Sequence, residues 1–180
     1  MTMKKHSISK IAVALAMLCV SAHAAAQLLA VKTNALMWGN LTPNIGLELV
    51  TSERTSVAGN IYYSIKTDKQ PIDCRLRGGD LQLRYWFSNR PMARSFVALG
   101  VQATRYNAFL NNTYHIGDAA GPGLVYGYTL PLSRRFNVEF SAGMSMMWYR
   151  ERLGGGEAYN NSGHRLMPMG LGISCSYIFK

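Results

Sequence analysis

The sequence is poor in the residues from which catalytic and metal sites are usually built. Beyond residue 27 it has only two histidines, His115 and His164, and no Cys/His spacing that fits a zinc site. Only two cysteines, Cys74 and Cys175, lie in the same part of the chain, too few for a disulfide scaffold. We expect no disulfide between them, because Cys74 falls in a predicted loop and Cys175 faces outward from a predicted strand.

Long hydrophobic runs are also missing. After Gln27 no apolar run approaches the roughly 20 residues that a membrane-spanning helix needs. Any membrane crossing by this part of the chain must therefore be made by strands. Acidic residues are scarce as well, with 9 Asp and Glu against 19 Lys and Arg.

The N-terminal segment has the features of a secretory signal. Lys4, Lys5 and Lys10 precede a short apolar run at Ile11–Val20, and small residues at Ala22–Ala26 offer cleavage sites. An uncleaved anchor is the less favoured alternative, because the apolar run is short.

We therefore predict a signal peptide at residues 1–26 and a single domain at residues 27–180. Without the signal the chain has 16 Lys and Arg against 9 Asp and Glu, a net charge of +7. For an exported protein, phosphorylated lipid head groups are the expected acidic neighbours, and no nucleic-acid partner is predicted.

What the domain does have is strict alternation of apolar and polar side chains, and it is clearest at the C-terminal end. In Leu171–Phe179 every odd position is apolar, and all even positions except Ile178 are small or polar. Such a period of two indicates a strand with one apolar face. The same pattern predicts eight strands, at residues 29–37, 45–49, 57–63, 81–87, 97–103, 124–130, 136–148 and 171–179.

The connections between these strands favour a particular fold. Short turns alternate with long predicted loops at Lys66–Gly79, Asn107–Ala120 and Glu151–His164. Aromatic residues such as Phe136 and Trp148 mark the two ends of an outward apolar band. We predict an all-β fold, an eight-stranded antiparallel up-and-down transmembrane β-barrel in the outer membrane of a Gram-negative bacterium, with external long loops.

The opposite face of the strands would line the barrel interior. It carries the charged residues Lys32, Glu48, Arg84 and Glu139 among small residues. Because an eight-stranded barrel is only wide enough for its own side chains, we predict a closed network of ion pairs that plugs the lumen. A catalytic or ion-conducting cluster is the alternative, and the narrow bore disfavours it.

Three segments resemble a known family. They are Val31–Leu36 with Trp38, Thr42–Glu48, and the Arg-Tyr-Trp-Phe run at Arg84–Phe87. Together they resemble an uncharacterised outer-membrane β-barrel family of the Bacteroidetes, a domain of unknown function numbered 3575. The resemblance implies a small outer-membrane barrel, encoded in some genomes beside fimbrial or surface-adhesin components, and it implies no known activity or cofactor.

Residues that could support chemistry lie in the predicted loops. His164 is close in sequence to Ser162 and could approach Glu157, but solvated loop histidines are favoured over a catalytic set. Arg150, Arg152 and Arg165 surround the third loop, at the level expected for lipopolysaccharide phosphates, and arginine suits bidentate phosphate contacts.

We therefore predict a non-enzymatic structural or surface-interaction protein, accessory to fimbriae or adhesins if the resemblance extends to function. Outer-membrane lipid, lipopolysaccharide and a surface protein bound through the external loops are the expected partners. Two alternatives stay open: a lipid-modifying enzyme of the outer membrane, and a soluble periplasmic β-barrel that binds an apolar ligand.

Overall fold

The computed structural model describes residues 28–65, 74–110, 113–153 and 161–179. These form eight strands and one short helix: β1 (Leu29–Asn34), α2 (Ala35–Gly39), β2 (Asn44–Val50), β3 (Thr55–Tyr63), β4 (Cys74–Trp86), β5 (Arg94–Leu110), β6 (Thr113–Pro131), β7 (Phe136–Leu153) and β8 (Asn161–Phe179). Each strand pairs antiparallel with the next, which confirms the predicted all-β, eight-stranded, up-and-down arrangement.

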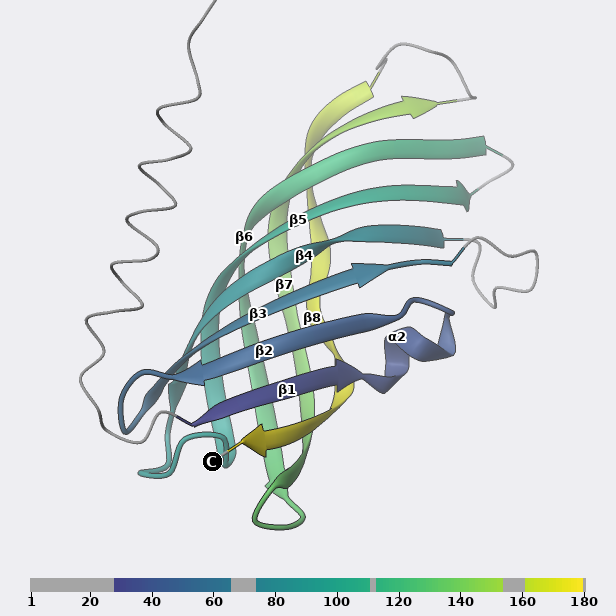
Figure 1. The fold of residues 1–180 in the computed structure, drawn as a ribbon. Coiled ribbons are helices and arrows are strands. Elements are labelled where there is room, and N and C mark those ends of the chain that lie inside the picture. Colours follow the sequence, from purple (N-terminus) through teal and green to yellow (C-terminus); the bar gives the residue numbers. More distant parts are fainter. Residues whose placement is uncertain (1–27, 66–73, 111–112, 154–160, 180) are drawn as a thin grey trace, which may run out of the picture.

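Pairing between the first and last strands closes the sheet into a barrel (Figure 1). β1 and β8 run side by side from Leu29 opposite Phe179 to Asn34 opposite Ser174. We call the end of the barrel that holds Leu29 and Phe179 the terminal end. The opposite end, beside which α2 lies, is the distal end.

The alternation in the sequence sorts side chains between the two faces of this sheet. On β5, Leu99 is 60% exposed on the outside, whereas its neighbour Ala98 is 1% exposed on the inside. The same holds around the barrel, so that large apolar side chains cover the outer face: Leu47, Ile61, Leu81, Leu83, Leu99, Val101, Leu124, Tyr126, Phe140, Met144, Trp148, Leu171 and Ile173.

An apolar cluster fills the interior at the terminal end. The rings of Trp86 and Phe96 lie 4.8 Å apart, and both side chains are fully buried. Met92 and Ile178 pack against the same cluster. Asn137 Nδ2 donates a hydrogen bond of 2.8 Å to the backbone oxygen of Met92, which holds the turn between β4 and β5 beneath the barrel. The lumen is therefore closed at this end.

The wall of the barrel is much taller on one side than on the other. β1 has 6 residues and β2 has 7, whereas β6 and β8 have 19 each. Within the described residues, β1 pairs with β8 only as far as Ser174, so the distal part of β8 keeps β7 as its strand partner. α2 lies beside this part of β8. The result is a closed barrel that continues distally as an open, curved sheet (Figure 1).

The structure corrects the prediction of three long loops. Most of Asn107–Ala120 belongs to β5 and β6, which stay paired as far as Leu110 opposite Thr113. Residues 74–79 belong to β4, and the described parts of Glu151–His164 belong to β7 and β8. Backbone hydrogen bonds between strands do not require apolar side chains, so the sheet continues where the hydrophobic alternation stops. The remaining parts of the first and third predicted loops lie outside the described residues.

A β-bulge explains why the last strand seemed to begin at Leu171. The register between β7 and β8 shifts between Ser141 and Gly143, and opposite this shift Gly170 adopts a φ of +61°. Glycine reaches this conformation at little cost. The bulge adds one residue to β8. The outward positions of β8 are therefore odd-numbered on the terminal side of the bulge and even-numbered on the distal side, which breaks the alternation in the sequence.

The first predicted strand is also shortened by a turn of helix. Asn34 caps α2, since its side-chain oxygen accepts a 3.0 Å hydrogen bond from the backbone N–H of Leu36. None of the described helical residues forms a helix long and apolar enough to cross a membrane. Cys74 starts β4 instead of lying in a loop, and Cys175 is exposed on the outer face; no disulfide joins them.

Candidate functional site

Four charged side chains from four strands meet inside the barrel. Lys32 Nζ donates hydrogen bonds to Glu48 Oε2 at 2.8 Å and to Glu139 Oε2 at 2.5 Å. Arg84 Nη1 lies 3.0 Å from the same oxygen of Glu48 and 2.9 Å from that of Glu139. All four residues are at most 4% exposed. Each cation thus contacts both carboxylates, and two positive charges balance two negative ones.

Neighbouring polar groups complete this network. Ser56 Oγ donates to the second oxygen of Glu48 at 2.6 Å, and Thr129 Oγ1 donates to Glu139 at 3.3 Å. Arg84 uses its Nε and Nη2 atoms to donate to Gln82 Oε1 at 3.1 and 2.9 Å. A buried charge is tolerated when it is paired and its hydrogen bonds are made, which is the case here. The arrangement suits a structural role.

Above the network the lumen is not completely filled. A cavity of about 320 Å³ lies between the ion pairs and α2. Asp80 Oδ1 accepts hydrogen bonds from Asn60 Nδ2 at 2.9 Å and from Gln82 Nε2 at 2.6 Å. Gln102 Nε2 donates to the Tyr62 hydroxyl at 3.2 Å. The cavity is therefore lined by hydrogen-bonding groups and has room for small polar molecules.

The sequence prediction missed this cavity. Asn60, Asp80 and Gln102 lie opposite one another on β3, β4 and β5, so they form one inward row. Asp80 fell between a predicted loop and a predicted strand, which hid its place in the alternation. Continuing the period of two backwards from Gln82 would have placed Asp80 on the inner face.

A second polar cluster lies on the inner side of the distal sheet. The Glu151 carboxylate accepts hydrogen bonds from Tyr106 Oη at 2.9 Å and Asn161 Nδ2 at 2.6 Å, and it lies 3.4 Å from His115 Nδ1. Burial opposes ionisation of Glu151, but the hydrogen bonds from these three groups hold the pKa of its carboxyl below the ordinary value. Burial and the adjacent carboxylate raise the pKa of Tyr106 well above its ordinary value.

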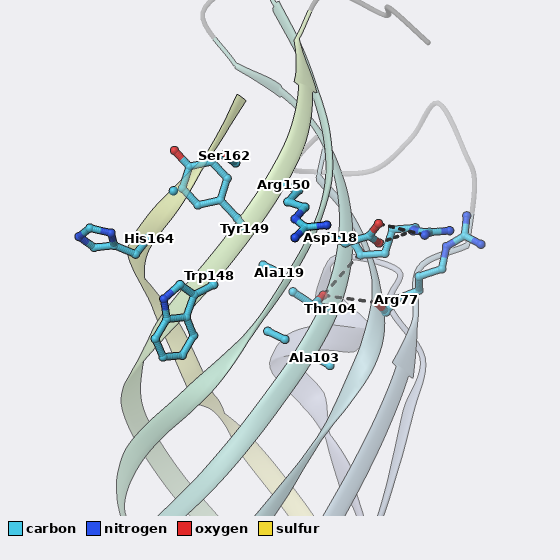
Figure 2. A pocket seen from close by; sticks show the side chains of 13 residues that line it. Arg77, Ala103, Thr104, Asp118, Ala119, Trp148, Tyr149, Arg150, Ser162 and His164 are labelled. Atoms are coloured by element: carbon cyan, nitrogen blue, oxygen red, sulfur yellow. Dashed lines mark hydrogen bonds and ion pairs between the residues drawn. The ribbon is translucent and has the colours of Figure 1, made fainter. Parts of the chain in front are cut away.

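On the outer face of the same sheet lies a row of charged residues. Arg77, Arg105, Asp118 and Arg150 occupy directly opposite positions on β4, β5, β6 and β7. We call these four residues the arginine row. Arg105 donates to the two oxygens of Asp118 at 2.5 and 3.0 Å. The row lines a hollow in the wall, and Figure 2 shows Arg77, Asp118 and Arg150 of the row with Trp148 on the other side.

A family comparison adds a classification. A family model described as a protein of unknown function (DUF3575) matches residues 11–179. The chain belongs to this family. The match confirms the family resemblance seen in the sequence, and the family's description assigns no activity. No curated protein matches the chain.

The other predicted site residues of this DUF3575 protein are spread over both faces. Arg150 faces outward in the arginine row, and Arg152 lies opposite Ile116, one step further along β7. Arg165 lies opposite the buried Met147, and its guanidinium stacks 4.7 Å from the centre of the Tyr149 ring. The structure therefore separates Arg165 from the outward arginines with which the sequence grouped it.

The sequence also raised a set of Ser162, His164 and Glu157. Ser162 and His164 are both exposed on the outer face of β8, and among the described residues no hydrogen bond joins them. Glu157 lies outside the described residues. In the part of the chain that the structure describes, no three His, Cys, Asp or Glu side chains are placed to hold a metal ion.

Proposed function

We propose that this DUF3575 protein is an integral outer-membrane β-barrel of a Gram-negative bacterium, without enzymatic activity, which serves as a structural or surface-interaction protein. The observation that supports this most is the inversion of its two faces. Large apolar side chains such as Ile61 and Leu124 are at least 60% exposed outside, while Lys32, Glu48 and Glu139 are buried inside. Monomeric soluble proteins rarely expose apolar patches of this extent, and lipid would cover this face.

The same inversion argues against the soluble ligand-binding alternative. A soluble barrel for an apolar ligand would need Phe140 and Ile173 to line the interior, and both are exposed on the outer face. In the proposed orientation the terminal end faces the periplasm and the distal end faces outward. The aromatic residues Tyr85, Phe87, Phe136, Tyr177 and Phe179 then form the periplasmic girdle.

Export and surface presentation complete the proposal. Residues 1–26 act as a cleaved signal peptide. The tall sheet of β4–β8 would extend past the lipid head groups, as a rigid support from which a surface partner could be bound. A role beside fimbrial or adhesin components follows from the family resemblance and belongs to the same proposal.

Two variants test the membrane assignment. Leu99→Arg puts a charge in the middle of the outer apolar band, where it should cost about 2–4 kcal/mol and reduce assembly. Leu132→Arg is the matched control, because Leu132 is 68% exposed but lies in a terminal-end turn outside the band.

The measurement is membrane fractionation together with the change in gel mobility between boiled and unboiled samples. Wild type and Leu132→Arg should remain in the outer-membrane fraction and show the heat-dependent shift, and Leu99→Arg should show much less folded protein. Recovery of the wild type in the soluble periplasmic fraction would contradict the proposal.

A further inference from the structure

The arginine row holds three cations and one carboxylate, and among the described residues only one of the cations forms a salt bridge. Arg77 and Arg105 lie directly opposite each other on neighbouring strands, an arrangement of like charges that is normally destabilising. Asp118 forms a salt bridge with Arg105. Arg77 stacks on Tyr63, with 5.6 Å from its guanidinium carbon to the ring centre. Within the described residues neither Arg77 nor Arg150 forms a salt bridge, so the row carries a net charge of +2.

Directly below the row, the outer wall is hollowed. The next outward positions are Gly79, Ala103 and Ala120, which lie opposite one another on β4, β5 and β6. Their small side chains leave a floor bounded by Ile61 on one side and Trp148 on the other. A side chain at position 79 is resisted by the backbone, since its Cβ would lie 2.5 Å from the carbonyl oxygen of Asn60.

The charged and apolar parts form one continuous groove. The hollow at the arginine row has a volume of about 880 Å³ and the one below it about 620 Å³. They share Ala103, Ala120 and Trp148. Figure 2 shows Arg77, Asp118 and Arg150 on one side of the pocket, with Ala103 below them. The groove thus passes from cationic to apolar in the direction in which an outer-leaflet lipid passes from head group to acyl chain.

We infer that this groove binds the lipid A part of lipopolysaccharide, with the arginine row on its phosphates and an acyl chain over Gly79, Ala103 and Ala120. The inference rests on the proposed membrane location. Strand spacing of about 4.8 Å separates Arg77 from Arg150 by about 14 Å along the row. Two guanidinium groups that have no salt-bridge partner among the described residues, at that separation, suit a head group with two separated phosphates better than a single phosphodiester.

Two variants test the two halves of the groove. Arg77→Gln combined with Arg150→Gln removes both unpaired cations, and Ala120→Leu fills the floor. Each has a matched control on the same molecule. Arg134→Gln removes an exposed arginine from a terminal-end turn, and Ala142→Leu enlarges a small outward residue away from the groove.

Binding is measured on the full-length protein, taken from membranes and placed in phosphatidylcholine nanodiscs. Bisphosphorylated lipid A is titrated, with dephosphorylated lipid A and phosphatidylglycerol as comparison probes. The double arginine variant should bind lipid A about 30-fold more weakly than wild type, because each of the two cations contributes roughly fivefold in affinity. Ala120→Leu should weaken binding severalfold, and both controls should match wild type.

The outcomes separate this inference from the proposed function. Equal binding of lipid A by the double arginine variant and wild type, both integral and heat-modifiable, overturns the groove and leaves the membrane assignment standing. Equal affinity of wild type for phosphatidylglycerol and lipid A overturns the choice of lipid A. If the wild-type protein is soluble without detergent, the membrane assignment is contradicted, and the inference that rests on it is overturned as well.

Discussion

The charged network inside the barrel and the arginine row outside it both combine cationic and acidic side chains, but only the network has equal numbers of the two. Inside, Lys32 and Arg84 face Glu48 and Glu139, all four buried, and every charge has a partner. Outside, the arginine row holds three arginines and one carboxylate, that of Asp118, which pairs with Arg105. A buried network must balance itself, because water cannot reach it. An exposed row can remain unbalanced, so its excess charge is available to a ligand.

The largest effect should come from unbalancing the interior. Arg84→Leu leaves Glu48 and Glu139 with Lys32 alone and removes the donors to Gln82. We expect it to lower the free energy of unfolding by roughly 3–5 kcal/mol, and Glu48→Leu to do the same, because each leaves a buried charge unpaired. Urea titration in lipid vesicles measures this, with Arg134→Leu at a turn as control. Unchanged stability of both variants would mean that the network does not support the fold.

Removing one charge of each sign restores the balance and sharpens the comparison. Arg84→Met combined with Glu139→Met leaves the Lys32–Glu48 pair intact. The double variant should lose less stability than the two single variants added together, with a coupling free energy between about 0.5 and 3 kcal/mol. A double-mutant cycle gives this quantity directly. Simple additivity would show that the two residues act independently of each other.

The polar cluster around Glu151 tests how much a buried carboxylate contributes when its hydrogen-bond donors are Tyr106, Asn161 and His115. Because the pKa of Glu151 is lowered in the folded protein, its stabilisation is present above the ordinary glutamate pKa of about 4.3 and is lost as the pH falls through the lowered pKa. Glu151→Gln should cost about 1–3 kcal/mol at pH 7.

The measurement is the unfolding free energy of Glu151→Gln and wild type from pH 7 down to pH 3. The difference in unfolding free energy between Glu151→Gln and wild type should narrow as the pH falls. Asn161→Ala, which removes one donor to the same carboxylate, is the control. The difference in unfolding free energy between Asn161→Ala and wild type should also narrow as the pH falls. A gap that is constant with pH would mean that ionisation of Glu151 does not contribute.

The smallest effect, and one of opposite sign, is expected at the arginine row. Arg77→Gln relieves the like-charge contact with Arg105 and should raise stability by about 0.2–1 kcal/mol when no anionic lipid is present. Arg105→Gln should not show this gain, because it also removes the salt bridge to Asp118. Unfolding titrations in phosphatidylcholine vesicles at low salt compare the two. A loss of stability in Arg77→Gln would argue that the row is already balanced by the protein.

The sequence was most informative where one face of a strand is apolar. Alternation around Leu83 and Val138 assigned both faces correctly, and the inward position of Glu48 and Glu139 followed from it. It was least informative in the distal half. There the outer face of β5 and β6 carries polar residues such as Arg105, Asn107 and Asp118, so the strands around Asn107 and Ala119 gave no periodic signal and looked like loop. Arg77 and Arg105 of the arginine row were missed for a similar reason, since Arg77 fell within the first predicted loop and Arg105 lies just before the second.

The amino-acid order alone determined the all-β class and the antiparallel succession of strands. It also determined which side chains share a face near the terminal end of the barrel, because a period of two follows from the geometry of an extended chain. Only the tertiary structure decided which residues lie opposite one another. Register sets Arg77 beside Arg105 and shifts at Gly170, and it depends on pairing between strands distant in sequence, which no local pattern records.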